Sequence, residues 1–149
     1  MKPSEELVSF IAREEGFRGN AYRPLPTDRW TVGFGFTYIN GTPVKEGDTI
    51  EISKARDELR RLLTNIGNAL SKKLPDSVTQ QKFDAVVSLT YNIGITAFIS
   101  STTGTLFYLG DDISNRFALY NRSGGKVIQG LVNRRNAERE IYVNGDYSK

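Results

Sequence analysis

The stretch "RWTVGFGFTY", residues 29–38, alternates large side chains with very small ones. A period of two residues is typical of a β-strand, whose successive side chains point to opposite faces. One face would carry the large side chains of Trp30, Val32, Phe34, Phe36 and Tyr38. The other face would carry only Thr31, Gly33, Gly35 and Thr37. Because glycine weakens a strand interior and often marks a close approach, this bare face is predicted to lie against another backbone or a ligand.

The patterns around this strand predict an α+β fold with a small β-containing lobe and a larger helical lobe. Apolar spacing predicts a short first helix that ends at Gly16, and the Asn-Gly and Gly-Asp pairs predict a β-hairpin over 30–50. Further helices are predicted over 53–74, 79–94, 100–110, 111–121 and about 130–142. The chain is expected to be one domain, 1–149, with the small lobe at about 15–55 and the helical lobe at about 56–149 plus the first helix. A cleft between two such lobes is a usual place for a binding site.

The composition excludes several kinds of chemistry. The 149 residues include no cysteine and no histidine, which removes disulfides, Ser-His-Asp triads and HExxH zinc sites. No metal ion and no cofactor is predicted. The net charge of +3 comes from scattered basic residues, which argues against nucleic-acid binding, and no apolar run reaches the length of a membrane span. Acid–base chemistry must then rest on carboxylates, lysine, tyrosine or hydroxyl groups.

Three residues near the first helix and the glycine-rich strand could carry such chemistry. Glu15 lies at the end of the helix, where the negative end of the helix dipole disfavours an ionised carboxylate and favours a general acid. Helical spacing does not distinguish it from Glu14, and a surface acid is the alternative for either. Asp28, in the loop before the strand, is either a turn residue or the ionised partner of a glycosidase acid. Thr31, on the bare face, is either a strand former or a group that orients water.

At these residues the chain resembles a known family. "EGFRGNAY" (15–22) followed by "WTVGFGFT" (30–37) is similar to the opening of the phage-type lysozymes, the muramidases of glycoside hydrolase family 24. Their pattern is Glu-Gly-x-Arg-x-x-x-Tyr, an Asp-bearing loop, and then Thr-hydrophobic-Gly-x-Gly. The similarity continues in the family's order through "VKEGDTI" (44–50), "QQKFDAVVSLTYNIG" (80–94), "AFISST" (97–102) and "GGKVIQGLVNRRNAERE" (124–140). It therefore covers nearly the whole chain.

The resemblance implies a lysozyme-like fold and hydrolysis of the β-1,4 bond between N-acetylmuramic acid and N-acetylglucosamine in peptidoglycan. It implies Glu15 as the general acid and Thr31 as a group that places the attacking water. Asp28, the only carboxylate in the loop, is expected to supply the charge of the family's aspartate from a shifted position in an inverting reaction. The residues expected to line the sugar cleft are Gly35, Phe36, Tyr91, Asn92 and Arg135. Arg135 is similar to the arginine that pairs with the catalytic glutamate. The bare face of the strand then becomes one wall of the cleft.

Two positions depart from the family pattern. Pro24 stands where the family normally has its catalytic aspartate. The loop is one residue longer than usual, and Asp28 is its only carboxylate. Phe36 stands where the family has a histidine. These departures motivate an alternative, a degenerate lysozyme-fold module that binds peptidoglycan or a protein without cleaving. A third hypothesis is a lytic transglycosylase or chitinase on the same scaffold. The enzyme hypothesis implies a monomer with no membrane or nucleic-acid partner, made in the host cytoplasm and released to the periplasmic cell wall through a phage holin.

Overall fold

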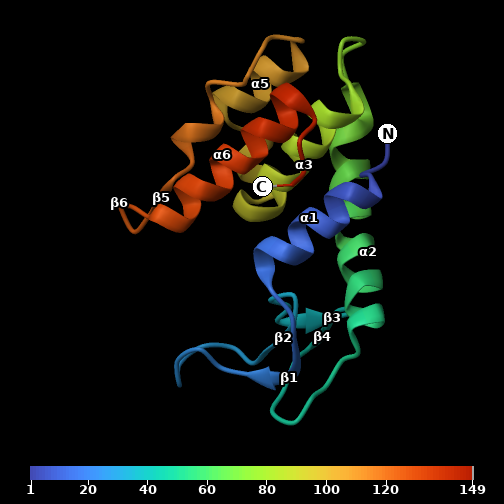
Figure 1. The fold of residues 1–149 in the computed structure, drawn as a ribbon, viewed down its shortest axis with the longest axis vertical. Coiled ribbons are helices and arrows are strands. Elements are labelled where there is room, and N and C mark those ends of the chain that lie inside the picture. The colour runs from blue at the N-terminus through green and yellow to red at the C-terminus, as the bar shows by residue number, and fades with distance from the viewer. Residues whose placement is uncertain (149) are drawn as a thin grey trace. The chain divides into compact units, whose positions relative to one another are not determined.

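The computed structural model describes residues 1–148 and has the expected α+β architecture (Figure 1). It forms two compact units, the small unit Val8–Leu62 and the helical unit, which comprises Met1–Leu7 and the chain from Leu63 onward. The boundaries fall inside two helices. The division therefore assigns most of the first helix to the small unit, where the sequence had placed it with the helical lobe.

Five of the six helices in residues 1–148 begin and end close to predicted residues, and the short helix Ile95–Ile99 was not predicted. The helices are α1 (Glu5–Glu15), α2 (Ile52–Leu70), α3 (Gln80–Ile93), α4 (Ile95–Ile99), α5 (Thr102–Tyr108) and α6 (Gln129–Asn144), with 3-10 turns at Ser71–Lys73 and Phe117–Leu119. Thr79 caps α3 by accepting a hydrogen bond from the Lys82 N–H, and Gly94 ends it, as predicted. The helix expected over 111–121 is wrong, because only the 3-10 turn forms there.

The strands are short and come in three antiparallel pairs. They are β1 (Arg18–Tyr22) with β2 (Thr31–Gly33), β3 (Tyr38–Ile39) with β4 (Thr42–Pro43), and β5 (Arg122–Ser123) with β6 (Lys126–Val127). The sequence missed β1 and the last pair, since it confined strand structure to residues 30–50. β5 and β6, with two residues each, carry too few side chains to show a period of two.

The predicted strand over 29–38 ends at Gly33, which corrects the two-faced interpretation of this stretch. Gly33 and Gly35 have φ angles of +69° and +84°, and the chain reverses between them. Val32 and Phe36 exchange backbone hydrogen bonds of 2.9 Å across the reversal. The rings of Phe34 and Phe36 are then both buried and contact each other edge to face, with centroids 6.2 Å apart. Phe34 also contacts Phe17, at 5.4 Å between centroids.

A buried carboxylate connects the β3–β4 hairpin to α2 within the small unit. Glu58 accepts a hydrogen bond of 2.9 Å from the backbone N–H of Asn40, whose φ of +49° forms the hairpin turn, and it pairs with Arg61. Burial alone would raise the pKa of Glu58, but the hydrogen bonds from Arg61 and from Asn40 outweigh it and lower the pKa. The carboxylate is therefore held in its ionised form.

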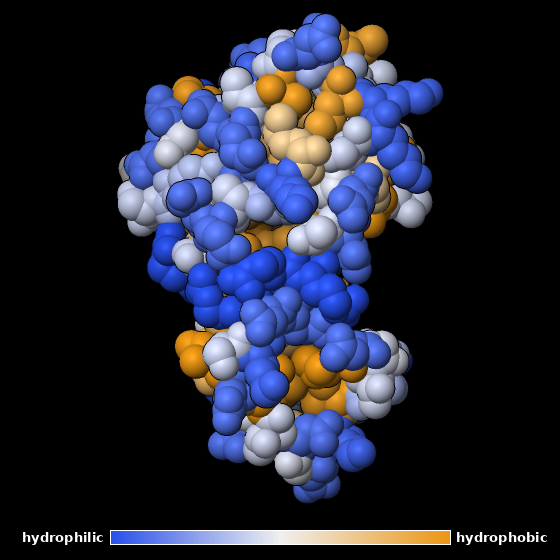
Figure 2. Space-filling model, turned by 90° about the vertical axis from the view of Figure 1, so that its right-hand side faces the viewer, coloured by the Kyte–Doolittle hydropathy of each residue, from blue (hydrophilic) through white to orange (hydrophobic). Residues whose placement is uncertain are grey.

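The helical unit is built around α3. Its residues Phe83–Thr90 are all buried, and α6 packs along it (Figure 1). Over the described residues, no helix combines the length and apolarity that crossing a bilayer requires. On the face drawn in Figure 2, hydrophilic side chains cover most of the surface and apolar ones gather in separate small patches.

We expect Gly33→Ala to lower the free energy of unfolding by about 2 kcal/mol. An added Cβ would lie 2.9 Å from the Phe36 ring, and alanine is strained at a positive φ. Gly130→Ala is the control, because a Cβ there meets nothing within 4 Å. Thermal unfolding measures both, and equal stabilities of Gly33→Ala and the wild type would contradict the reversal.

We expect Glu58→Gln to lower the free energy of unfolding by about 1 kcal/mol at pH 7. Since folding lowers the pKa of Glu58, its ionised form stabilises the fold above the ordinary carboxyl pKa, and this contribution is lost as the pH falls through the folded value. The variant and the wild type should therefore converge in acid. Denaturant unfolding between pH 7 and pH 3 tests this, with Glu46→Gln, at an exposed position, as the control. A difference that stays constant with pH would contradict the assignment.

Candidate functional site

Glu15 is the last residue of α1, and a glycine lies beside its side chain. The residue is half-buried, whereas its neighbour Glu14 is exposed. A Cβ added to Gly35 would lie 3.5 Å from the Glu15 carboxylate oxygen Oε2, so the reversal passes directly beside the carboxylate. The absence of a side chain at Gly35 leaves room beside Glu15 for another group. The structure thus places Gly35 beside Glu15, a proximity that the sequence did not predict.

Thr31 opens β2 and is largely buried, with 9% of its surface exposed. Its hydroxyl donates a hydrogen bond of 3.1 Å to the Arg29 carbonyl. The hydroxyl proton is thereby directed at the backbone, and the oxygen keeps its capacity to accept a hydrogen bond from another group, such as water.

Asp28 lies at the exposed end of the loop between β1 and β2, where its carboxylate takes part in a turn. Its Oδ2 accepts a hydrogen bond of 2.9 Å from the Leu25 N–H, and its own N–H donates to the Leu25 carbonyl. Arg23 stiffens the same loop, since it donates to the Pro26 carbonyl and stacks over the Trp30 ring. The turn role that the sequence left open for Asp28 is therefore present, and its catalytic role stays a prediction.

Phe36 lies in the core of the small unit with 3% of its surface exposed. Its ring supports the reversal that carries Gly35. A direct contact of Phe36 with a sugar, as predicted from the sequence, would need this ring to leave the core.

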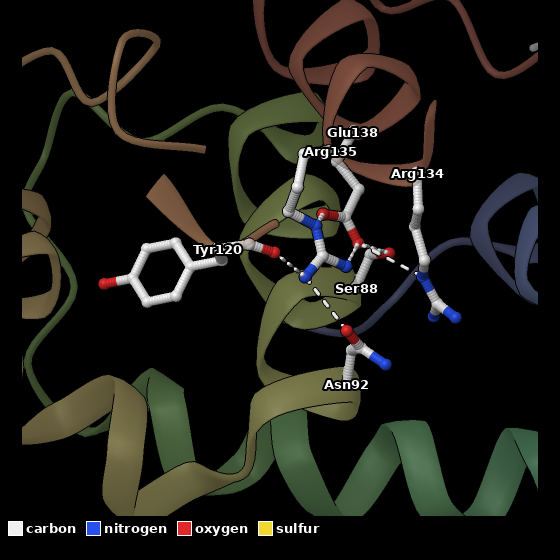
Figure 3. Close-up of polar contacts among 6 residues, drawn as sticks. All are labelled: Ser88, Asn92, Tyr120, Arg134, Arg135 and Glu138. Carbon is white, nitrogen blue, oxygen red and sulfur yellow. Dashed lines mark hydrogen bonds and ion pairs between the residues drawn. The ribbon is translucent and has the colours of Figure 1, made fainter. Parts of the chain in front are cut away.

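The helical unit contains a buried ionic cluster that sequence reasoning largely missed (Figure 3). Arg135 and Glu138, both on α6, are 1% and 0% exposed, and the Arg135 Nε lies 2.7 Å from the Glu138 Oε1. Ser88 on α3 donates a hydrogen bond of 2.5 Å to the other Glu138 oxygen, from which the Arg134 Nε is 3.6 Å away. Burial raises the pKa of Glu138, while the two arginines and Ser88 act in the opposite direction. Two signals could have indicated the cluster, namely Arg and Glu three positions apart on a helix and a serine inside an apolar run.

Asn92 and Tyr91 lie near the C-terminal end of α3, where Asn92 is exposed and Tyr91 half-buried. The Asn92 Oδ1 accepts a hydrogen bond of 2.9 Å from the Arg135 Nη1. Of the predicted cleft residues, the structure thus joins Asn92 and Arg135. Glu15 belongs to the other compact unit, and its pairing with Arg135 stays a prediction.

The small unit has a pocket of about 520 Å³ that contains none of the predicted catalytic residues. Asp48, Lys54, Asp57 and Arg61 line it together with the buried Glu58, and Val32 forms part of its wall. Among residues 1–148, no three side chains of the metal-binding types are grouped so that they could hold an ion.

Residues 12–138 match the family model described as phage lysozyme. The endolysin of Bacillus phage PZA is 37% identical over 150 residues, which cover 97% of this chain. The chain spans little more than half of that relative, 56% of its length. The endolysin of Salmonella phage P22 is 32% identical over 149 residues, and there the match covers 96% of this chain and 99% of the relative.

The fold is also similar to solved structures of such proteins. The endolysin from Escherichia coli O157:H7 phage FAHEc1 superposes with a TM-score of 0.89 at 34% sequence identity, covering 100% of this chain and 98% of that one. This agreement confirms the lysozyme-like fold class that the sequence predicted.

Proposed function

Because the chain belongs to the phage lysozyme family, we propose that it is an endolysin that hydrolyses the β-1,4 bond between N-acetylmuramic acid and N-acetylglucosamine in peptidoglycan. The observation that carries this proposal is the position of Glu15. Its carboxylate stands at a helix end, half-buried, beside a glycine that leaves room for a bulky polymer. The endolysin names of the relatives support the same conclusion.

In the proposed reaction Glu15 is the general acid. It donates its proton to the glycosidic oxygen as the bond to the anomeric carbon breaks, so the leaving sugar departs as a neutral alcohol. A water molecule attacks the anomeric carbon from the opposite face, which inverts its configuration. Thr31 accepts a hydrogen bond from this water, and Asp28 takes its proton. An inverting pair of carboxyl groups stands about 6.5–9.5 Å apart to leave space for the water.

The expected site of action is the periplasmic cell wall, reached from the host cytoplasm by release through a phage holin. Peptidoglycan is the proposed partner, and a monomer suffices because every proposed catalytic group comes from one chain. The alternative is a lysozyme-fold module that binds the wall without cleaving it. The observation behind this alternative is that the Asp28 carboxylate already accepts a hydrogen bond in its turn.

We expect Glu15→Gln to lower the rate of peptidoglycan hydrolysis by about 10²–10⁴-fold, because glutamine cannot donate the proton. Glu14→Gln is the matched control, since it makes the same change one residue earlier at an exposed position. The assay is clearing of permeabilised Gram-negative cells, with thermal unfolding run in parallel. If the Glu15→Gln variant clears cells as fast as the wild type, Glu15 is not the general acid. Sacculi that bind wild-type protein without releasing muropeptides would favour the non-cleaving module.

We expect Asp28→Asn to lower the hydrolysis rate by about 10²-fold without loss of stability. Asparagine keeps an oxygen for the Leu25 N–H and removes only the charge. An unchanged rate would assign Asp28 to the turn alone. Mass spectrometry of the wild-type products adds a second test, because hydrolysis leaves a reducing sugar, whereas a lytic transglycosylase leaves an anhydromuropeptide.

A further inference from the structure

The buried ion pair Arg135–Glu138 carries a large desolvation penalty for a contact inside a helical core. Removing both charges from water costs several kcal/mol per ion, and apolar side chains of similar volume often stabilise such a site equally well or better. Both side chains are nearly inaccessible to solvent. The pair therefore calls for an explanation beyond stability.

The hydrogen bonds of Arg135 lead from this buried pair to the surface (Figure 3). Its Nη2 donates to the Glu138 Oε2 at 3.0 Å, and its Nη1 donates to the Asn92 Oδ1 at 2.9 Å and to the Tyr120 carbonyl at 3.3 Å. Ser88 holds the Glu138 carboxylate from the other side. The guanidinium is planar and rigid, so fixing one edge on Glu138 also fixes the direction in which Nη1 points.

This geometry determines which way the Asn92 amide faces. An arginine can only donate hydrogen bonds, so the atom of Asn92 that it contacts must be the oxygen. The Nδ2 group then turns away from Arg135, as Figure 3 shows. Asn92 is exposed, so the protein presents two N–H donors of fixed direction at its surface.

We propose that Glu138 and Arg135 are positioning residues that hold Asn92 with its amide N–H groups outward, so that Asn92 donates to an acceptor oxygen of the glycan. This inference rests on the proposed function. In solution an asparagine amide can turn by 180° and offer either group, and such a side chain loses rotational freedom when a ligand binds. Because Arg135 holds the oxygen, the Asn92 amide loses its rotational freedom when the protein folds and not when the glycan binds. Glycan binding is therefore tighter.

The first test is Asn92→Asp, which keeps the shape of the side chain and the acceptor for Arg135 but replaces the outward N–H groups by an oxygen. We expect the KM for peptidoglycan to rise about tenfold, with kcat changed less than about threefold. Asn136→Asp on α6 is the control, because it adds the same charge at an exposed position. An unchanged KM in Asn92→Asp would overturn the proposal, and an equal rise in the control would assign the effect to charge.

The second test asks whether Arg135 acts through Asn92. Lysine in Arg135→Lys keeps the charge but cannot bond Glu138 and Asn92 in the same fork geometry. We expect it to raise KM severalfold in the wild type and less than about twofold in an Asn92→Ala background. Equal rises in both backgrounds would show a merely structural role. If Arg135→Lys does not fold, Ser88→Ala, which removes one hydrogen bond to Glu138, replaces it in the same comparison.

The third test uses the unaltered protein and does not depend on any variant that perturbs the core. In a titration with the soluble trimer of N-acetylglucosamine followed by NMR, the side-chain N–H signals of Asn92, assigned by their loss in Asn92→Ala, should shift. Shifts elsewhere without a change at Asn92 would overturn the proposal. Because wild-type hydrolysis is measured separately, failure of the positioning role and failure of the proposed function give different results.

Discussion

The ion pair between Arg135 and Glu138 is the interaction on which the organisation of the helical unit depends. Through it, α6 is joined to Ser88 and Asn92 of α3 and to the backbone at Tyr120, just after the 3-10 turn Phe117–Leu119. Leaving either charge without the other would expose the unit to the full penalty of a buried unpaired ion. The pair therefore ties three segments to one arrangement, and it does so with directional bonds that apolar contacts do not supply.

In the small unit, the half-buried carboxylate of Glu15 lies beside a turn that packs on a folded core. A side chain at the position of Gly35 would lie against the Glu15 carboxylate, and a straight strand through residues 29–38 would not reverse beside it. The turn at Gly33 and Gly35 avoids both, because glycine adopts positive φ at little cost. Phe34 and Phe36 fill the core beneath the turn, and Glu58 attaches the next hairpin to α2. A packed base and a turn without side chains therefore lie beside the carboxylate.

Much of this arrangement could be predicted from patterns of side chains. The helices show in the sequence because each buries one apolar face, or in α3 nearly every face, and because Thr79 and Gly94 have the chemistry of helix ends. Glu15 was also a candidate acid from its place at a helix end, and Gly35 was expected to line the sugar cleft, but the approach of Gly35 to Glu15 came only from the structure. The strand over 29–38 was not, because alternation cannot reveal that two of its glycines have positive φ, and Phe36 was placed in the cleft although it belongs to the core. The roles of Glu138 and Ser88 were missed, since a charged residue and a serine on separate helices give no local signal of their contact.

The sequence by itself determined the α+β fold class, the family resemblance, the absence of histidine and cysteine, and the candidate residues Glu15, Asp28 and Thr31. These follow from residue types and from spacing along the chain, which are local properties. Only the tertiary structure decided that the chain reverses at Gly33–Gly35, that Asp28 bonds within a turn, and that Arg135 bonds Glu138 and Asn92. These features depend on backbone angles and on which donors meet which acceptors after folding. The same arginine could equally have formed a solvated ion pair, and burial against α3 is what turned it into a directional link between a buried carboxylate and a surface amide.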